Sequence, residues 1–129
     1  GLAITSAASA ELIAWWKFDD GSGTTALDSS GNGHDGTLNG DAAWETGHLG
    51  GALRLDGAGD YVNCGLVDAD TAATGGLTVC AWINKASGGD MKFCSNRQGA
   101  NAAGGGFTCT IYNDRMEMDL TDAGARTLN

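Results

Sequence analysis

The chain has no proline, few cations and no long apolar run. Seven Lys and Arg stand against 16 Asp and Glu, and the resulting formal net charge of −9 repels nucleic acid and anionic membrane surfaces at long range. No apolar stretch approaches the ~20 residues that cross a bilayer, so no integral membrane segment is expected. Neutral sugars, metal cations and basic proteins are the partners that this charge favours.

The cysteines do not have metal-site spacing. They are Cys64, Cys80, Cys94 and Cys109. None forms a C-x-x-C pair and only two histidines accompany them, which disfavours a zinc site and favours disulfides in an oxidising compartment. Three pairings are possible. If the segments around Met91 and Phe107 form a hairpin, Cys94 and Cys109 fall nearly opposite each other, and Cys64 is left with Cys80.

Apolar and polar residues alternate with period two in five segments, each bounded by Gly, Asn, Asp or Ser. These are residues 12–18, 52–55, 77–83, 107–111 and 116–120. Such alternation is typical of strands, and the 22 glycines gather between them as turns require. Residues 77–83 are apolar on both faces, which predicts a central strand, and Asn113-Asp114 predicts a hairpin turn. The fold class is therefore all-β.

The first ten residues differ from the rest. Residues 1–10 are small and apolar and end in Ala8-Ser9-Ala10, a sequence typical of a secretory cleavage site. We expect residues 1–10 to be a signal-peptide tail or an N-terminal arm, and residues 11–129 to be one β-sandwich domain, because a chain of this length makes about one domain. The expected location is extracellular or at the cell surface.

Several blocks occur in a recognisable order. Ala14-Trp15-Trp16-Lys17-Phe18-Asp19-Asp20 is followed by Leu27-Asp28-Ser29-Ser30-Gly31-Asn32-Gly33-His34-Asp35-Gly36, by Gly47-His48-Leu49-Gly50-Gly51-Ala52-Leu53-Arg54-Leu55-Asp56-Gly57, and by Gly59-Asp60-Tyr61-Val62. This order resembles the opening half of laminin-G-like, concanavalin-A-like jelly-roll domains. The resemblance implies a two-layer antiparallel β-sandwich. It also implies that the late strands of such domains are missing here, so the sandwich is incomplete or is completed by a neighbouring subunit.

Two tryptophans are candidates for contact with carbohydrate or another partner. Trp15 and Trp16 are adjacent on an expected strand and must point to opposite faces, so one enters the core and the other covers an outer face or a partner. We take Trp16 as the partner residue. Trp44 lies in a loop-like stretch, where its indole either stacks on a sugar ring or closes one end of the sandwich.

Oxygen-bearing side chains are concentrated in glycine-containing loops. They are Asp19, Asp20, Asp28, Asn32, Asp35, Asp56 and Asp60. Calcium takes six to eight oxygen ligands, and the family resemblance implies a structural Ca²⁺ bound by some of Asp19, Asp28, Asn32 and Asp56. Asp and Asn are also ordinary turn formers.

An acidic pair near the C-terminus bears on catalysis. Glu117-Met118-Asp119 is similar to part of the signature of glycoside hydrolases with this fold, and paired carboxylates perform retaining hydrolysis. The third acidic residue of that signature is a Glu, and this chain has Asp122 in its place. Any half-exposed strand also alternates acidic and apolar residues in this way. We therefore expect a secreted, non-enzymatic module that recognises carbohydrate or protein, as lectin-like adhesion domains do. The alternative is a structural subunit of a filament or sheath that assembles through open sheet edges and the N-terminal arm.

Overall fold

A computed structural model describes residues 11–65, 67, 77–85, 89–96, 106–112 and 115–121. All regular elements in these residues are strands in antiparallel sheets. This confirms the all-β class and is consistent with a sandwich. The chain divides into two compact units, Gly1–Val79 and Cys80–Asn129.

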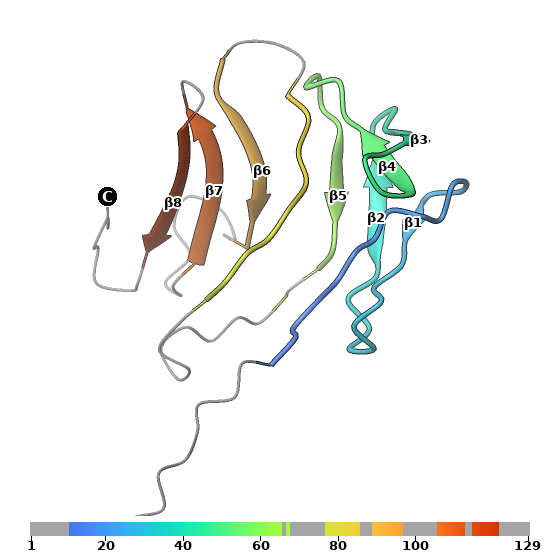
Figure 1. Cartoon of the computed structure of the whole chain (residues 1–129), viewed down its shortest axis with the longest axis horizontal. Coiled ribbons are helices and arrows are strands. Elements are labelled where there is room, and N and C mark those ends of the chain that lie inside the picture. The colour runs from blue at the N-terminus through green and yellow to red at the C-terminus, as the bar shows by residue number, and fades with distance from the viewer. Residues whose placement is uncertain are drawn as a thin grey trace, which may run out of the picture. The chain divides into compact units, whose positions relative to one another are not determined.

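The first unit contains five short strands. They are β1 (Thr25–Ala26), β2 (Gly36–Asn39), β3 (Ala43–Thr46), β4 (Gly51–Arg54) and β5 (Tyr61–Asn63). Strands β1, β2 and β5 lie side by side in that order, and β3 and β4 form a separate hairpin (Figure 1). The strand expected at residues 52–55 is confirmed as β4, displaced by one residue. An exposed ion pair joins Arg54 Nε to Glu45 Oε1 across the hairpin at 2.8 Å.

Small residues allow β1, β2 and β5 to approach closely. Ala26 is completely buried and pairs with Gly36, which is also buried. A β-carbon on Gly36 would collide with Val62 Cγ1 and would lie 3.1 Å from Cys64 Sγ. Gly36 is therefore required by lack of space, and its own φ is not in the left-handed region.

The strand expected at residues 12–18 is wrong. Only an isolated bridge, Trp16 to Asp28, is found there. The physical reason is that loop side chains form the hydrogen bonds to backbone groups that a neighbouring strand would otherwise form. The amide of Asn32 donates to the carbonyls of Leu12 and Ile13 at 2.9 and 2.8 Å.

Asp28 is the centre of this attachment. Its carboxylate accepts hydrogen bonds from the N–H groups of Trp15, Ser30 and His34 at 2.9, 2.8 and 3.0 Å, and from the Ser30 hydroxyl at 2.7 Å. Desolvation raises the pKa of Asp28, but these hydrogen bonds outweigh it and hold the pKa well below its ordinary value of 3.8. The Ser29 N–H also donates to the Trp15 carbonyl at 2.7 Å.

A second attachment joins this segment to β4. Phe18 adopts a φ of 58°, in the left-handed region that a bulky residue rarely enters. Asp19 Oδ1 then accepts the N–H of Gly51 at 2.6 Å. A β-carbon on Gly51 would collide with the Phe18 carbonyl. The turn at Phe18 and the missing side chain at Gly51 together permit the contact.

The second unit contains one three-stranded sheet. Its strands, β6 (Met91–Ser95), β7 (Gly106–Tyr112) and β8 (Arg115–Thr121), lie side by side in that order (Figure 1). The strands expected at 107–111 and 116–120 are confirmed, as is the register that places Cys94 opposite Cys109. Tyr112 pairs with Arg115 across the β7–β8 ladder; the expected turn at Asn113-Asp114 lies outside the described residues.

The central strand expected at residues 77–83 is also wrong. No strand is present from 77 to 85, although the alternation in burial follows the prediction over Leu77, Thr78, Val79 and Cys80. Trp82 is 79% exposed. Alternation records which side chains face solvent and does not show that the backbone is paired, so an extended segment with one exposed face has the same pattern.

Replacing Gly36 by Ala should destabilise the protein. The added methyl group must displace Val62 or the strand itself, and overpacking of this kind costs about 1–3 kcal/mol. Chemical unfolding measures the change. Thr37→Ala, at the exposed neighbouring position, is the control and should change the free energy of unfolding by less than about 0.5 kcal/mol. Equal losses in both variants would contradict the packing argument.

Replacing Asp28 by Asn should lower the thermal unfolding midpoint by several degrees at neutral pH, because one carboxylate oxygen that accepts hydrogen bonds becomes an NH₂ group. A carboxylate whose pKa falls on folding stabilises the fold above its unfolded pKa, near 3.8, and loses this effect as the pH drops toward the folded pKa. The difference between wild type and Asp28→Asn should therefore shrink below about pH 4. Melting curves from pH 7 to pH 2 measure it. Asp90→Asn, at an exposed position, should show no such trend.

Candidate functional site

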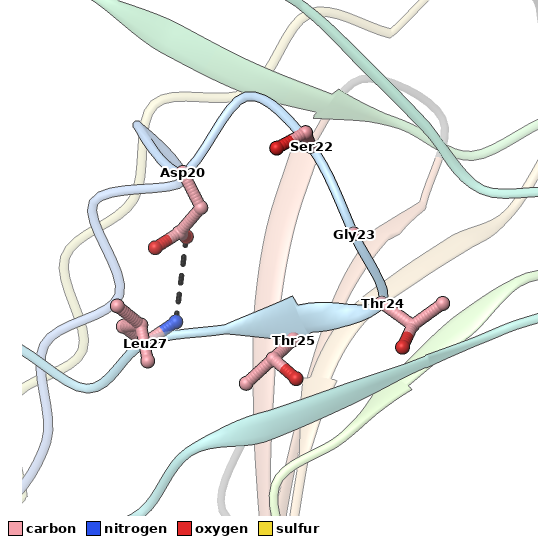
Figure 2. Close-up of a pocket in the computed structure, with 6 residues that line it drawn as sticks. All are labelled: Asp20, Ser22, Gly23, Thr24, Thr25 and Leu27. Carbon is pink, nitrogen blue, oxygen red and sulfur yellow. Dashed lines mark hydrogen bonds between the residues drawn. The ribbon is translucent and has the colours of Figure 1, made fainter.

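A shallow, open depression of about 540 Å³ lies in the first unit, between the loop before β1 and β1 itself. It is lined by Asp20, Ser22, Gly23, Thr24, Thr25 and Leu27. Figure 2 shows the loop doubling back on β1, with the Asp20 carboxylate directed at the N–H of Leu27, which donates to Asp20 Oδ2 at 3.3 Å. The lining combines one carboxylate, hydroxyl groups and an exposed leucine side chain. Such a surface offers hydrogen bonds and a small apolar area to a neutral polar ligand.

Trp44 is attached to the rim of this depression. It lies on β3, is partly buried, and its Nε1 donates to the Gly23 carbonyl at 2.9 Å. The hydrogen bond fixes the indole relative to the depression. Of the two residues predicted to contact a ligand, Trp44 is therefore the one next to a concave surface. The contact of Trp44 with a sugar stays a prediction.

Trp16 is used within the chain. It is partly buried, and its Nε1 donates to the His34 carbonyl at 2.7 Å. Trp15 is 50% exposed, and Lys17 Nζ lies 4.7 Å from the centre of its ring. Of the two adjacent indoles, Trp15 is thus the one on the outer surface, and partner contact at Trp16 stays a prediction.

The four residues predicted to bind calcium lie in three places. Asp28 and Asn32 share one loop, joined through the Ser30 hydroxyl. Asp19 is bonded to Gly51, and Asp56 Oδ1 accepts the N–H of Ala58 at 2.7 Å. Both oxygens of Asp28, one oxygen each of Asp19 and Asp56, and the side-chain NH₂ group of Asn32 are thus engaged in local structure.

Asp56 belongs instead to an acidic group with Asp41 and Asp60, whose carboxylate oxygens lie within 4.8 Å of one another. Asp60 accepts the N–H groups of Asp41 and Asp56, each at 2.9 Å. The hydrogen bond from Asp56 first, and that from Asp41, lower the pKa of Asp60 against the opposing effect of desolvation. Three carboxylates suit a hard divalent cation, with further oxygens needed to complete its shell. Calcium binding stays a prediction.

Sequence reasoning missed Asp41 as a member of this group. Its position follows from the pairing of β2 with β5, which places Asn39 opposite Tyr61 and brings the residues just beyond each strand together. The sequence shows the acids and the glycines, but it does not show which loops meet.

All four cysteines lie among the described residues, and none of them is joined in a disulfide. Cys64 and Cys94 are partly buried, Cys109 is buried and Cys80 is exposed. Desolvation raises the pKa of Cys94, as does the charge of Cys109, and desolvation raises that of Cys109. The register needed for a Cys94–Cys109 bridge is present, and the disulfides themselves stay a prediction.

The acidic pair of the hydrolase hypothesis occupies β8. Glu117 pairs with Thr110 and Asp119 with Thr108, so both carboxylates lie on one face of the strand, as predicted. Glu117 is exposed and Asp119 is partly buried. Asp122 lies outside the described residues. The absence of enzymatic activity stays a prediction, and glycoside hydrolysis stays the minor alternative to it.

No helix able to cross a membrane occurs in the part of the chain that the structure describes.

Among known proteins, the chain has a match with a solved structure. No protein-family model matches the chain, and no curated protein matches it. It is similar to the crystal structure of residues 221–444 of an S-layer domain-containing protein from Clostridium thermocellum ATCC 27405, with a TM-score of 0.66 and 22% sequence identity. The likeness covers 88% of this chain and 53% of the other, so this chain spans about half the length of that structure. At this identity the likeness shows the fold alone, and the laminin-G-like or concanavalin-A-like family stays a prediction.

Proposed function

We propose that this chain is a structural domain of an extracellular or cell-surface assembly and that it associates through an open sheet edge. The observation that carries the proposal is strand β8. It has seven residues, it ends the β6-β7-β8 sheet, and within the described residues only its β7 side is paired. A long unpaired edge presents N–H and C=O groups to another strand.

Exposed apolar side chains support association. Met116 on β8 is 66% exposed, Leu49 is 70% exposed and Trp82 is 79% exposed. Scattered exposed apolar residues are normal on monomers, but a methionine on an open edge strand adds apolar area where backbone pairing is also available. We therefore place the contact at β8.

The fold likeness supports the location. The similar crystal structure is that of an S-layer domain-containing protein, a name that suggests a cell-surface or extracellular location. The likeness concerns about half of that structure, so assembly by this chain rests on its own strand edge. The arm at residues 1–10, which the sequence also suggested for assembly, lies outside the described residues.

Light scattering and negative-stain microscopy over rising protein concentration test the proposal. We expect reversible self-association of the wild type, weakened about tenfold or more in Met116→Lys, which is about 1.4 kcal/mol of association free energy. A lysine on an edge strand opposes pairing by like charge when two copies meet and by solvation of its ammonium group.

Leu49→Lys is the matched control. Leu49 is equally exposed and lies in the β3–β4 loop rather than on a strand. The Leu49→Lys substitution adds the same charge away from the edge strand β8, so this variant should associate as the wild type does. A wild-type chain that stays monomeric at every concentration refutes the proposal. Equal loss in both lysine variants refutes the placement at β8.

Carbohydrate recognition is a second candidate function, favoured by one observation. The depression between Asp20 and Leu27 has hydroxyl and carboxylate groups, and Trp44 is hydrogen-bonded to its rim. Aromatic rings placed beside hydrogen-bonding groups suit the flat apolar face of a sugar ring together with its hydroxyls.

Glycan-array binding followed by titration tests this second function. If a neutral glycan binds here, Trp44→Ala and Thr25→Val should each weaken binding, by at least about tenfold for the tryptophan. Trp15→Ala is the control, because Trp15 is exposed but does not line the depression. An array without hits, or equal binding by Trp44→Ala and wild type, removes the carbohydrate hypothesis.

A further inference from the structure

Three sulfur-bearing residues form one row across the β6-β7-β8 sheet. Cys94 on β6 pairs with Cys109 on β7, and Cys109 pairs with Met118 on β8. Residues directly opposite in antiparallel strands point to the same face, with β-carbons ~4.5–5.5 Å apart. Two thiols and a thioether therefore lie side by side on one face of the sheet.

A β-bulge places Cys94 in this row. The register shifts between Lys92, which pairs with Thr110, and Cys94, which pairs with Cys109. Without the extra residue, Phe93 would stand opposite Cys109 and Cys94 would face the other side of the sheet. Bulges re-aim side chains and are frequent beside functional sites.

The two faces of the sheet differ in ligand chemistry. The neighbouring row on the sulfur face contains Met91, Ile111 and Met116, so all three methionines of the chain lie in these two rows. The other face contains Lys92, Ser95, Thr108, Thr110, Glu117 and Asp119. Soft thiol and thioether groups are thereby separated from hard carboxylate and hydroxyl oxygens.

We propose that the row Cys94, Cys109 and Met118 binds one copper(I) ion. Thiolate and thioether ligands suit soft metals, Cu(I) and zinc among them, but structural zinc sites take four ligands of the Cys and His type, and a thioether is not one of these. Neither of the two thiols is in a disulfide. Each gives up its proton, and two thiolates and one Cu⁺ form a complex of net charge −1, with two protons released to solvent and no electron transferred.

Burial supports the site in two ways. Cys109, at the centre of the row, is 1% exposed and so can hold the ion away from water. Cys94 and Met118 on either side are only partly buried, which provides a path for entry.

The test is Cu(I) titration of the reduced protein without oxygen, against a chromophoric Cu(I) chelator. We expect one ion per chain, and the same affinity in a Cys64→Ser/Cys80→Ser variant. Cys94→Ser should abolish binding, and Met118→Leu, which keeps the side-chain volume, should weaken it about tenfold or more. Met116→Leu, in the adjacent row, is the matched control and should bind as the wild type does.

The outcomes separate the site from general thiol binding. If Cys94→Ser fails to fold, Met118→Leu still decides, because a methionine-to-leucine change is tolerated in packing. Equal affinity of Met118→Leu and wild type, or loss of the ion only in the Cys64→Ser/Cys80→Ser variant, overturns the proposal. So does reduced protein that takes up no Cu(I) and instead closes a Cys94–Cys109 disulfide when exposed to cystine. Assembly is measured separately, so this result leaves the β8 proposal unaffected.

Discussion

The structure of the first unit depends on the Asp28 carboxylate. Its four hydrogen bonds join the segment before β1, its own loop and the residue two positions before β2. A short strand such as β1, with two residues, cannot supply ladder bonds to three neighbouring segments. Because buried or half-buried backbone groups must find partners, a carboxylate with several acceptor sites replaces the missing strand. The position of Trp16 against the His34 carbonyl follows from the same attachment.

The two units therefore hold their chain segments in different ways. In the first, side chains of Asp19, Asp28 and Asn32 bind backbone groups that no strand pairs. In the second, longer strands pair with each other. The backbone groups on the outer edge of β8 have no partner strand within the described residues. A side chain that binds a backbone group satisfies that group alone. A sheet, in contrast, can pair with a further strand at any open edge. An open ladder is thus the more suitable site for a second copy of the chain.

Sequence patterns predicted the second unit better than the first. The strands β7 and β8 and the opposition of Cys94 and Cys109 follow from alternation and turn residues, because these strands are paired along their whole length. Residues 12–18 alternate equally well and form no strand, since the bonds come from Asp28 and Asn32 far along the chain. The sequence did not predict that Asp41 joins Asp56 and Asp60, for a related reason. Asp41 and Asp60 are brought together only by the β2–β5 pairing, which single-sequence patterns do not reveal.

Two clusters of side chains could hold a cation, and they differ in how far their arrangement is explained without one. In the acidic group, both oxygens of Asp60 already accept backbone N–H bonds, and one oxygen of Asp56 does the same. A metal ion there competes with bonds that shape the loops, so the acids are explained without it. In the sulfur row, a Cys94–Cys109 disulfide would use the same alignment of the two cysteines but would leave Met118 without a role. Cys109 could pack as a small apolar residue, but packing does not require the bulge that turns Cys94 toward it. The one-residue insertion aligns the two thiols, which suits a disulfide or a metal ion, and a ligand that needs all three sulfur atoms also accounts for the thioether of Met118 beside them.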